Sequence, residues 1–140
     1  TLDLVLLPDP PSNTGVNCEK IGDLTLVLAA RDSVTATEAV SDRYIYVDWG
    51  TRFANFHARK FGEHSKPALH VNLASNALNM IESNGGAAYL PKSTVTSTEF
   101  LQIVEGSPSF KRPIFACYQE GNTRIDLIKE VTSLLEGISI

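Results

Sequence analysis

Long apolar runs and clustered basic side chains are both missing from this 140-residue chain. No stretch approaches the roughly 20 apolar residues that a membrane-spanning helix needs, and no signal peptide opens the sequence. The formal net charge is −4, and the nearest thing to a basic cluster is the scattered group of Arg52, Arg59 and Lys60. Such a surface gains little affinity for phosphate backbones by counterion release. We therefore expect a cytoplasmic protein that contacts no membrane and does not hold DNA through this part of the chain.

Cysteine is scarce as well. Cys18 and Cys117 lie far apart in the sequence, and neither belongs to a CxxC or Cys/His pattern. Cys117 lies in an apolar, strand-like run, where a free thiol behaves as a small hydrophobic side chain. Because disulfides are rare in a reducing cytoplasm, we expect both cysteines to be reduced and buried. The chain is 43% hydrophobic, which is enough apolar material for a core without a disulfide or a structural metal.

Sequence patterns for catalysis or metal binding are also missing. His57, His64 and His70 have no metal-site spacing such as HxxxH, and no cysteine or carboxylate joins them. No GxSxG sequence is present to expose a nucleophilic serine. Gly85 and Gly86 follow a predicted helix instead of preceding one, so they indicate a helix C-cap and not a phosphate-binding loop. The sequence thus predicts no metal, no cofactor and no catalytic residue, and we expect the protein not to be an enzyme.

What the chain does contain is an alternation of strand-like and helix-like segments, which predicts an α/β fold. Strands are predicted at residues 2–7, 21–31, 44–49, 68–72, 87–90, 100–104 and 114–118. Helices are predicted at residues 51–61, from an N-cap at Ser75 to residue 84, and around residues 127–135, with a short helical turn in the polar segment 33–42. The chain starts with Thr1 and already reads as a buried strand at residues 2–7, so we expect it to be part of a longer protein.

With these elements in this order, the sequence resembles the effector-binding domain of LysR-type transcription regulators over nearly its whole length. The segments that carry the resemblance are LDLVLLPDPP, IGDLTLVLAARD, YIYVDWGTRF, VNLASNALNMIESNGGAAYLPKS, RPIFACYQ and the terminal amphipathic segment. The most specific are VDWG before a helix and NALNMIESNGGAAYLP, which matches the family's helix, G-x-G, apolar pair and Leu-Pro ending. Asn84 replaces the first glycine of that pattern. The combination is most similar to the HdfR-like branch.

The resemblance implies a fold like that of type II periplasmic binding proteins, with two lobes joined by crossover strands and a small molecule held between them. Residues 1–31 would be part of the first lobe, which would be incomplete, and the first crossover strand. Residues 32–111 would be the second lobe with its connections, and residues 112–140 the return crossover strand and the C-terminal helix of the first lobe. DNA would be bound only by an N-terminal domain absent from this chain. An open sheet edge left by missing strands can pair with a second copy, so we expect a homo-oligomer.

Candidate ligand-binding residues follow from the position of helix starts, because ligands of open α/β lobes lie beyond the carboxyl ends of strands. Backbone N–H groups at a helix start suit an anion, hydroxyls add hydrogen bonds, and an arginine can pair with an anion in a bidentate way. The alternatives are that Thr51 and Ser75 only cap helices and that Arg52 is a solvated surface residue. Likewise, Trp49 could belong to the core, and the turn at Pro8 and Asp9 could merely end a strand. The candidates are Pro8, Asp9, Trp49, Gly50, Thr51, Arg52, Ser75 and Asn76.

The function that follows is effector sensing for a transcription regulator. A small molecule, for which an anion is a good candidate, would shift the population between two lobe arrangements and so change how the attached domain holds DNA. One alternative is a stand-alone or periplasmic-type solute-binding module, which would need an export signal. A second is a small α/β enzyme, which would need a constellation of catalytic residues that this sequence does not show.

Overall fold

The computed structural model describes residues 5–7, 15–119 and 138–139 of the chain. The chain divides into two compact units. Unit 1 combines the described residues of Thr1–Thr25 and Lys111–Ile140, and unit 2 is the continuous segment Leu26–Phe110. The predicted C-terminal amphipathic helix, and Pro8 and Asp9, lie outside the described residues.

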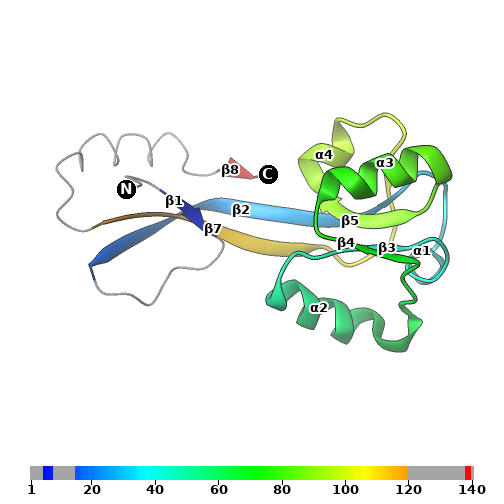
Figure 1. Ribbon diagram of the computed structural model, residues 1–140, viewed down its shortest axis with the longest axis horizontal. Helices are drawn as coiled ribbons and strands as arrows, with labels where there is room; N and C mark the ends of the chain where they lie inside the picture. The colour runs from blue at the N-terminus through cyan, green and yellow to red at the C-terminus, as the bar shows by residue number, and fades with distance from the viewer. Residues whose placement is uncertain (1–4, 8–14, 120–137, 140) are drawn as a thin grey trace. The chain divides into compact units, whose positions relative to one another are not determined.

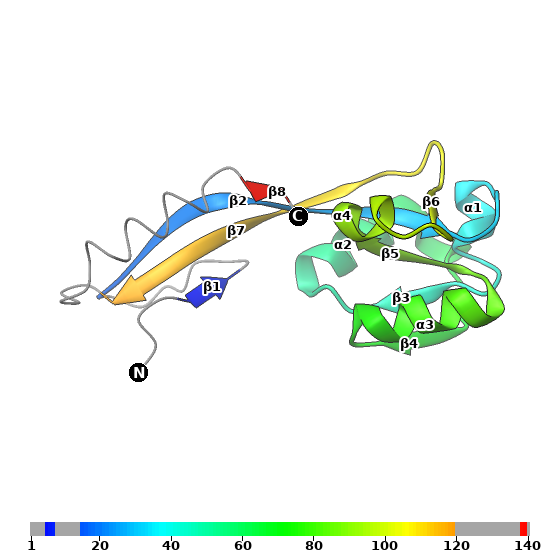
Figure 2. The same cartoon turned by 90° about the horizontal axis from the view of Figure 1, so that it is seen from above.

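Unit 1 is formed by strands. They are β1 (Val5–Leu7), the first part of β2 (Val16–Ala30), β7 (Phe110–Gln119) and β8 (Ile138–Ser139). Strand β7 lies between β1 and β2, and it runs back alongside β2 in the opposite direction (Figure 2). β1 is antiparallel to β7, and β8 is parallel to β2. Two of these strands are longer than the sequence predicts, because polar residues at their ends join the ladder although they break the apolar pattern.

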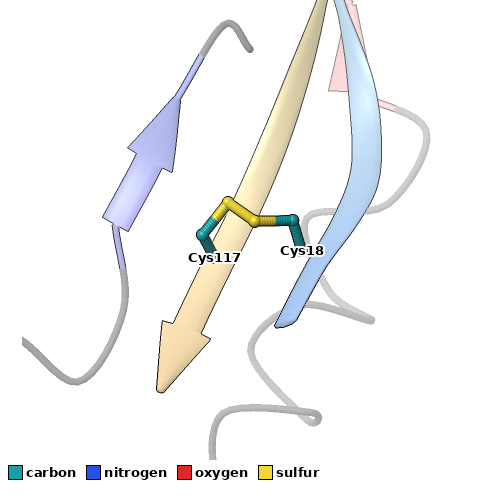
Figure 3. The surroundings of a disulfide bond; sticks show 2 residues. All are labelled: Cys18 and Cys117. Carbon is teal, nitrogen blue, oxygen red and sulfur yellow. A yellow bond between two sulfur atoms is a disulfide. The ribbon is translucent and has the colours of Figure 1, made fainter. Parts of the chain in front are cut away.

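A disulfide joins Cys18 of β2 to Cys117 of β7 (Figure 3). The prediction of two reduced cysteines is therefore wrong. The cysteines are separated by 99 positions in the sequence, but the pairing of their strands brings the Cα atoms to 4.1 Å. The expected burial is confirmed for Cys117, which is 4% exposed, whereas Cys18 is partly exposed.

Unit 2 is built from the end of β2 and from further strands and helices. The further elements are α1 (Ala36–Ala39), β3 (Ile45–Val47), α2 (Thr51–Phe61), η1 (Gly62–His64), β4 (Leu69–Val71), α3 (Ala74–Asn84), β5 (Ala87–Pro91), α4 (Lys92–Thr96) and β6 (Gln102–Ile103). Strands β3 and β4 are parallel, and β5 and β6 are antiparallel to β2. Helices α3 and α4 lie on one side of the strands and α2 on the other (Figure 1). No helix among the described residues is both long and apolar enough to cross a membrane.

Apolar residues alternate between the two sides of the unit 2 strands, because successive side chains of a strand point to opposite faces. Ile45 and Val47 of β3 belong to the aliphatic core under α3. Tyr44 and Tyr46 face the rings of α2 instead. The aliphatic core is completed by Val27, Ala29, Ala77, Ile81, Ala88, Leu90, Val95 and Leu101. The sequence pattern YIYVDW thus supplies both layers from one strand.

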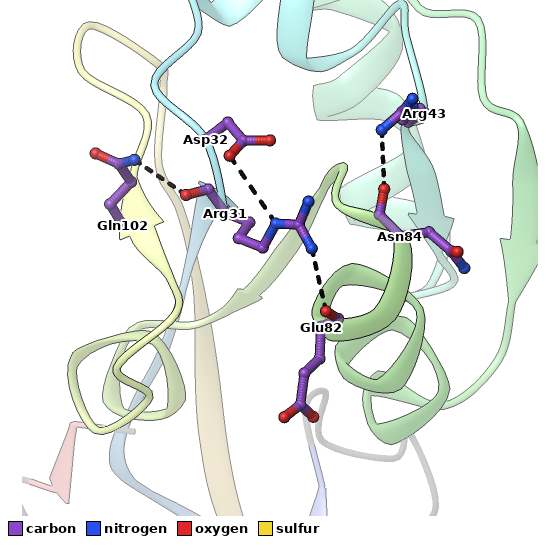
Figure 4. Close-up of polar contacts among 6 residues, drawn as sticks. All are labelled: Arg31, Asp32, Arg43, Glu82, Asn84 and Gln102. Atoms are coloured by element: carbon purple, nitrogen blue, oxygen red, sulfur yellow. Dashed lines mark hydrogen bonds and ion pairs between the residues drawn. The ribbon is translucent and has the colours of Figure 1, made fainter.

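Two arginines and two glycines close the C-terminal end of α3, and Figure 4 shows the two arginines. Arg31 donates to the carbonyl oxygen of Glu82 at 3.1 Å, and Arg43 donates to that of Asn84 at 2.9 Å. Cations at a helix C-terminus stabilise its unpaired carbonyls. Gly85, with φ +76, and Gly86, with φ +115, continue the chain in conformations that other residues rarely adopt. The predicted helix end at Asn84 is confirmed, but the sequence pattern did not reveal the two arginines.

Candidate functional site

Parallel pairing of β3 and β4 brings the starts of two helices to the same edge of unit 2. Helix α2 begins four residues after β3 ends, and α3 begins three residues after β4 ends. The carboxyl ends of the strands are also linked, since the backbone N–H of Asp48 donates to the carbonyl of Val71 at 3.0 Å. The predicted residues on Gly50–Arg52 and at Ser75 and Asn76 therefore lie at one edge, as the strand–helix order requires.

The turn before α2 depends on glycine. Gly50 is the N-cap with φ 99 and ψ −179, a conformation that a residue with a Cβ rarely adopts. Its backbone N–H donates to the carboxylate of Asp48 at 2.9 Å. No side chain caps the helix, and the first turn holds no acidic residue. Thr51 is the first residue of the helix and not its cap, so its side chain and that of Arg52 are exposed at the helix start.

The start of α3 differs from the prediction. Leu73, with an extended backbone, is the N-cap, and no side-chain hydrogen bond caps the helix. The prediction of Ser75 as N-cap is wrong: Ser75 lies in the first turn, and the N–H of Asn76 donates to the carbonyl of Leu73 at 3.2 Å. The preference of hydroxyl side chains for N-cap positions led to the prediction of Ser75, but the N-cap lies two residues earlier, at Leu73. The side chains of Ser75 and Asn76 are exposed, and Leu73 is 60% exposed.

Trp49 has a structural contact that supports its core interpretation. Its indole N–H donates to the carbonyl oxygen of Tyr89 in β5 at 2.9 Å. The ring is partly buried and packs against the aliphatic core. Trp49 thus attaches the turn at Gly50 to β5, which fixes where α2 starts.

Three cavities of the described residues lie away from this edge, and one of them, of about 360 Å³, lies between residues 32–36 and 102–105. A groove of about 660 Å³ is formed at the amino ends of β3 and β4 and the C-terminal end of α3. A smaller cavity, of about 140 Å³, lies beside α1 and contains the carboxylates of Asp32, Glu38 and Asp42 and the side chain of Arg43. Within the described residues, no group of three or more histidine, cysteine and carboxylate side chains is arranged to hold a metal ion. None of the predicted ligand-binding residues that the structure describes lines these cavities.

A buried histidine of α2 lies among aromatic rings. His57 is 6% exposed, and its Nε2 is hydrogen-bonded to the hydroxyl of Tyr44 at 2.8 Å. Burial lowers the pKa of His57, since desolvation penalises the imidazolium form. Burial also raises the pKa of the Tyr44 and Tyr89 hydroxyls far above the ordinary tyrosine value. These groups are neutral at neutral pH, so they form a packing cluster and not an acid–base pair.

Comparison with known proteins gives one family over nearly the whole chain. The profile of the LysR substrate binding domain matches residues 1–137. The HTH-type transcriptional regulator HdfR of Yersinia pestis (strain Pestoides F) is 26% identical over 93% of this chain. The chain spans 48% of the length of that relative.

Solved structures agree with the fold. A full-length OxyR variant from Pseudomonas aeruginosa superposes with a TM-score of 0.70 at 15% identity, covering 96% of this chain and 52% of that one. The regulatory domain of CcmR from Synechocystis PCC6803, solved in complex with 2-PG, superposes with a TM-score of 0.66 at 18% identity, covering 99% and 76%. At these identities the likeness concerns the fold, and it confirms the predicted α/β fold of the type II periplasmic-binding-protein kind.

Proposed function

Because the chain belongs to the LysR substrate binding domain family, we propose that it is the effector-sensing part of a DNA-binding transcription regulator. The regulator would act in the cytoplasm, and its DNA-binding part would be a helix-turn-helix domain outside this chain. The family is one of regulators, which sets aside the alternative of a periplasmic-type solute-binding module. The proposed role is sensing and not catalysis.

The proposed ligand site is supported by one observation: α2 and α3 begin at the same edge of unit 2. Neither helix start is capped by a side chain, and first-turn backbone N–H groups of such a start can donate to an acceptor, except that of Asn76, which donates to Leu73. Thr51 and Ser75 place exposed hydroxyls there, and Arg52 adds a positive charge. An anion of carboxylate or phosphate type matches this set of donors. The carboxylate of Asp48 already accepts from Gly50, which favours a ligand that also carries a donor group.

We also propose Pro8 and Asp9, which follow the first predicted strand and lie outside the described residues, as ligand-binding residues. Trp49 and Gly50 have supporting roles at the same edge. Trp49 attaches the turn before α2 to β5 through its hydrogen bond, and Gly50 adopts the backbone conformation that this turn requires. Such a ligand shifts the equilibrium of the regulator only by its differential affinity for the two conformations.

Self-association is part of the proposal. Strand β4 pairs with β3 on one side, and its other edge has no strand partner among the described residues. Unpaired backbone groups of such an edge favour pairing with another chain. We therefore expect a homo-oligomer, which light scattering of the purified chain will detect as a mass that is a multiple of the monomer mass.

Arg52 and Arg59 give a matched test of the ligand site, because they lie at opposite ends of the same helix. The purified chain would be titrated with a panel of small carboxylates and phosphate esters, and backbone amide shifts of residues 51–53 and 74–76 would be followed by NMR. Arg52→Gln should weaken the binding of a responding anion about tenfold, in line with a charge-assisted pair. Arg59→Gln removes the same charge at the C-terminal end and should leave binding unchanged. Equal weakening by both variants would show only a general effect of net charge and would contradict the site.

A further inference from the structure

We propose that the Cys18–Cys117 disulfide is a reversible redox latch, made and broken by thiol–disulfide exchange, which sets how firmly strands β2 and β7 are held together. The inference rests on the proposed function, because a transcription regulator works in a reducing compartment. Disulfides that form in such a compartment are usually transient and redox-sensing. The same bond in an exported protein would be ordinary scaffolding.

The positions of the two cysteines in the chain place a long segment between them. Cys18 is on β2, by which the chain enters unit 2, and Cys117 is on β7, by which it leaves (Figure 3). All of Leu26–Phe110 lies between the two cysteines in the sequence. The bond therefore closes a covalent ring that contains the whole chain of unit 2. When it is reduced, only non-covalent contacts keep β2 and β7 together at this place.

The strand pair around the bond contains both buried and exposed side chains among the residues whose burial is described. Among the unit 1 residues whose burial is described, the buried ones are Ile21, Thr25, Ala116 and Cys117. The neighbouring Lys20–Asp23 ion pair at 3.3 Å is largely exposed, and such a pair contributes little. The covalent bond adds to the hydrogen bonds between β2 and β7 in holding this part of the pair.

The two sulfurs differ in accessibility, which assigns the chemical steps. Cys117 is 4% exposed on the central strand, with β1 paired along its other side, whereas Cys18 is partly exposed. A small thiolate such as glutathione attacks Sγ of Cys18, the disulfide bond breaks and Cys117 leaves as a thiolate. A second glutathione thiolate attacks the glutathione sulfur of the mixed disulfide and releases the Cys18 thiolate and oxidised glutathione. The two electrons that reduce the protein come from the two glutathiones, and oxidised glutathione drives the reverse reaction.

A redox titration of the purified chain tests the latch. The protein would be equilibrated in mixtures of reduced and oxidised glutathione that span the ratios between a reducing cytosol and an oxidising compartment. Free thiols would then be alkylated and counted by intact mass, and amide hydrogen exchange would be measured at both ends of the titration. Cys18→Ser with Cys117→Ser provides a control that cannot form the bond under any condition.

The latch predicts a reversible change from dithiol to disulfide within that range of ratios. It also predicts amide exchange about tenfold or more faster across residues 16–25 and 111–119 in the reduced chain. Residues 87–91 of β5 should exchange equally in both states, and the double serine variant should behave like the reduced chain throughout.

A bond that stays closed at every ratio would show a structural disulfide, and one that never forms would show two thiols. Either result overturns the latch, and so does a titration without a change in exchange. The anion titration tests the proposed function separately. If the chain shows the expected redox titration but binds no small anion, the latch stands and the proposed ligand site is contradicted.

Discussion

Acidification should destabilise the protein through His57, the buried histidine of α2. Its side chain is 6% exposed among aromatic rings, and burial lowers its pKa below the ordinary 6.5. The unfolded chain then binds a proton that the folded chain does not. The contribution of His57 to stability is therefore complete above about pH 6.5, and it is lost as the pH falls from there towards the lowered pKa of the folded state.

The size of this loss of stability follows from the difference in proton binding by His57 between the unfolded and the folded chain. The free energy of unfolding can fall by at most about 1.4 kcal/mol for each pH unit below the unfolded-state pKa. Between about pH 7.5 and about pH 5.5, an imidazole that stays neutral when folded costs about 1.4 kcal/mol in total, because it titrates in the unfolded chain only over the lower half of that range.

Urea denaturation at these two pH values, under conditions that keep the disulfide intact, measures the effect. His57→Phe is the control, because a phenylalanine ring suits the cluster and does not titrate. The variant leaves the hydroxyl of Tyr44 without its histidine partner, which lowers stability at every pH, so only the pH-dependent difference is compared. The wild-type chain should lose more stability than the variant on acidification, by up to about 1.4 kcal/mol. Equal losses in the two proteins would refute the argument, since acid sensitivity would then come from other groups.

Five substitutions test the local structure of unit 2 by urea denaturation. Gly86→Ala should cost more than about 2 kcal/mol, because its methyl group would overlap the carbonyl oxygen of Arg43, whereas Gly106→Ala, with open space around it, should cost about 1 kcal/mol from its positive φ alone. Thr35→Ala should cost about 1 kcal/mol by removing the capping box of α1. Ser75→Ala should change stability by less than about 0.5 kcal/mol, since Ser75 caps no helix. Ile81→Ala, at a fully buried position, should cost about 2–5 kcal/mol, and a smaller loss would contradict the packing of α3 on the strands.

The parts of the fold that the sequence predicted are those in which local pattern and burial agree. The run YIYVDW has the alternation and composition of a central strand, and Phe53, Phe56 and Phe61 have the spacing of one helical face. Asn84 and the glycines after it mark a helix end through backbone conformation alone. In each case the information lies within a few residues of the element itself.

The parts that the sequence did not predict depend on contacts between distant segments. The disulfide needs β2 and β7 to be neighbours, which no spacing of 99 residues can indicate. Helix α4, with the sequence KSTVT, is too short and too polar for a periodic pattern. Arg31 and Arg43 reach the end of α3 from other segments, so their roles appear only once the sheet is formed.

The candidate site was predictable to the level of its helix starts. The rule that helix starts gather where parallel strands end placed Thr51, Arg52, Ser75 and Asn76 correctly at one edge. The mode of capping was not predictable, since Gly50 and Leu73 take the cap positions. Trp49 was left open between ligand and core, and its hydrogen bond to β5 favours the core.

The central claim is that this chain senses an effector for a DNA-binding regulator. Its most direct test is the intact mass of the natural polypeptide, immunoprecipitated from its source cell and sequenced from its N-terminus. We expect a natural polypeptide about twice as long as this chain, with a helix-turn-helix domain ahead of the residues described here. A natural polypeptide no longer than 140 residues would contradict the account, and a stand-alone binding module would then replace it.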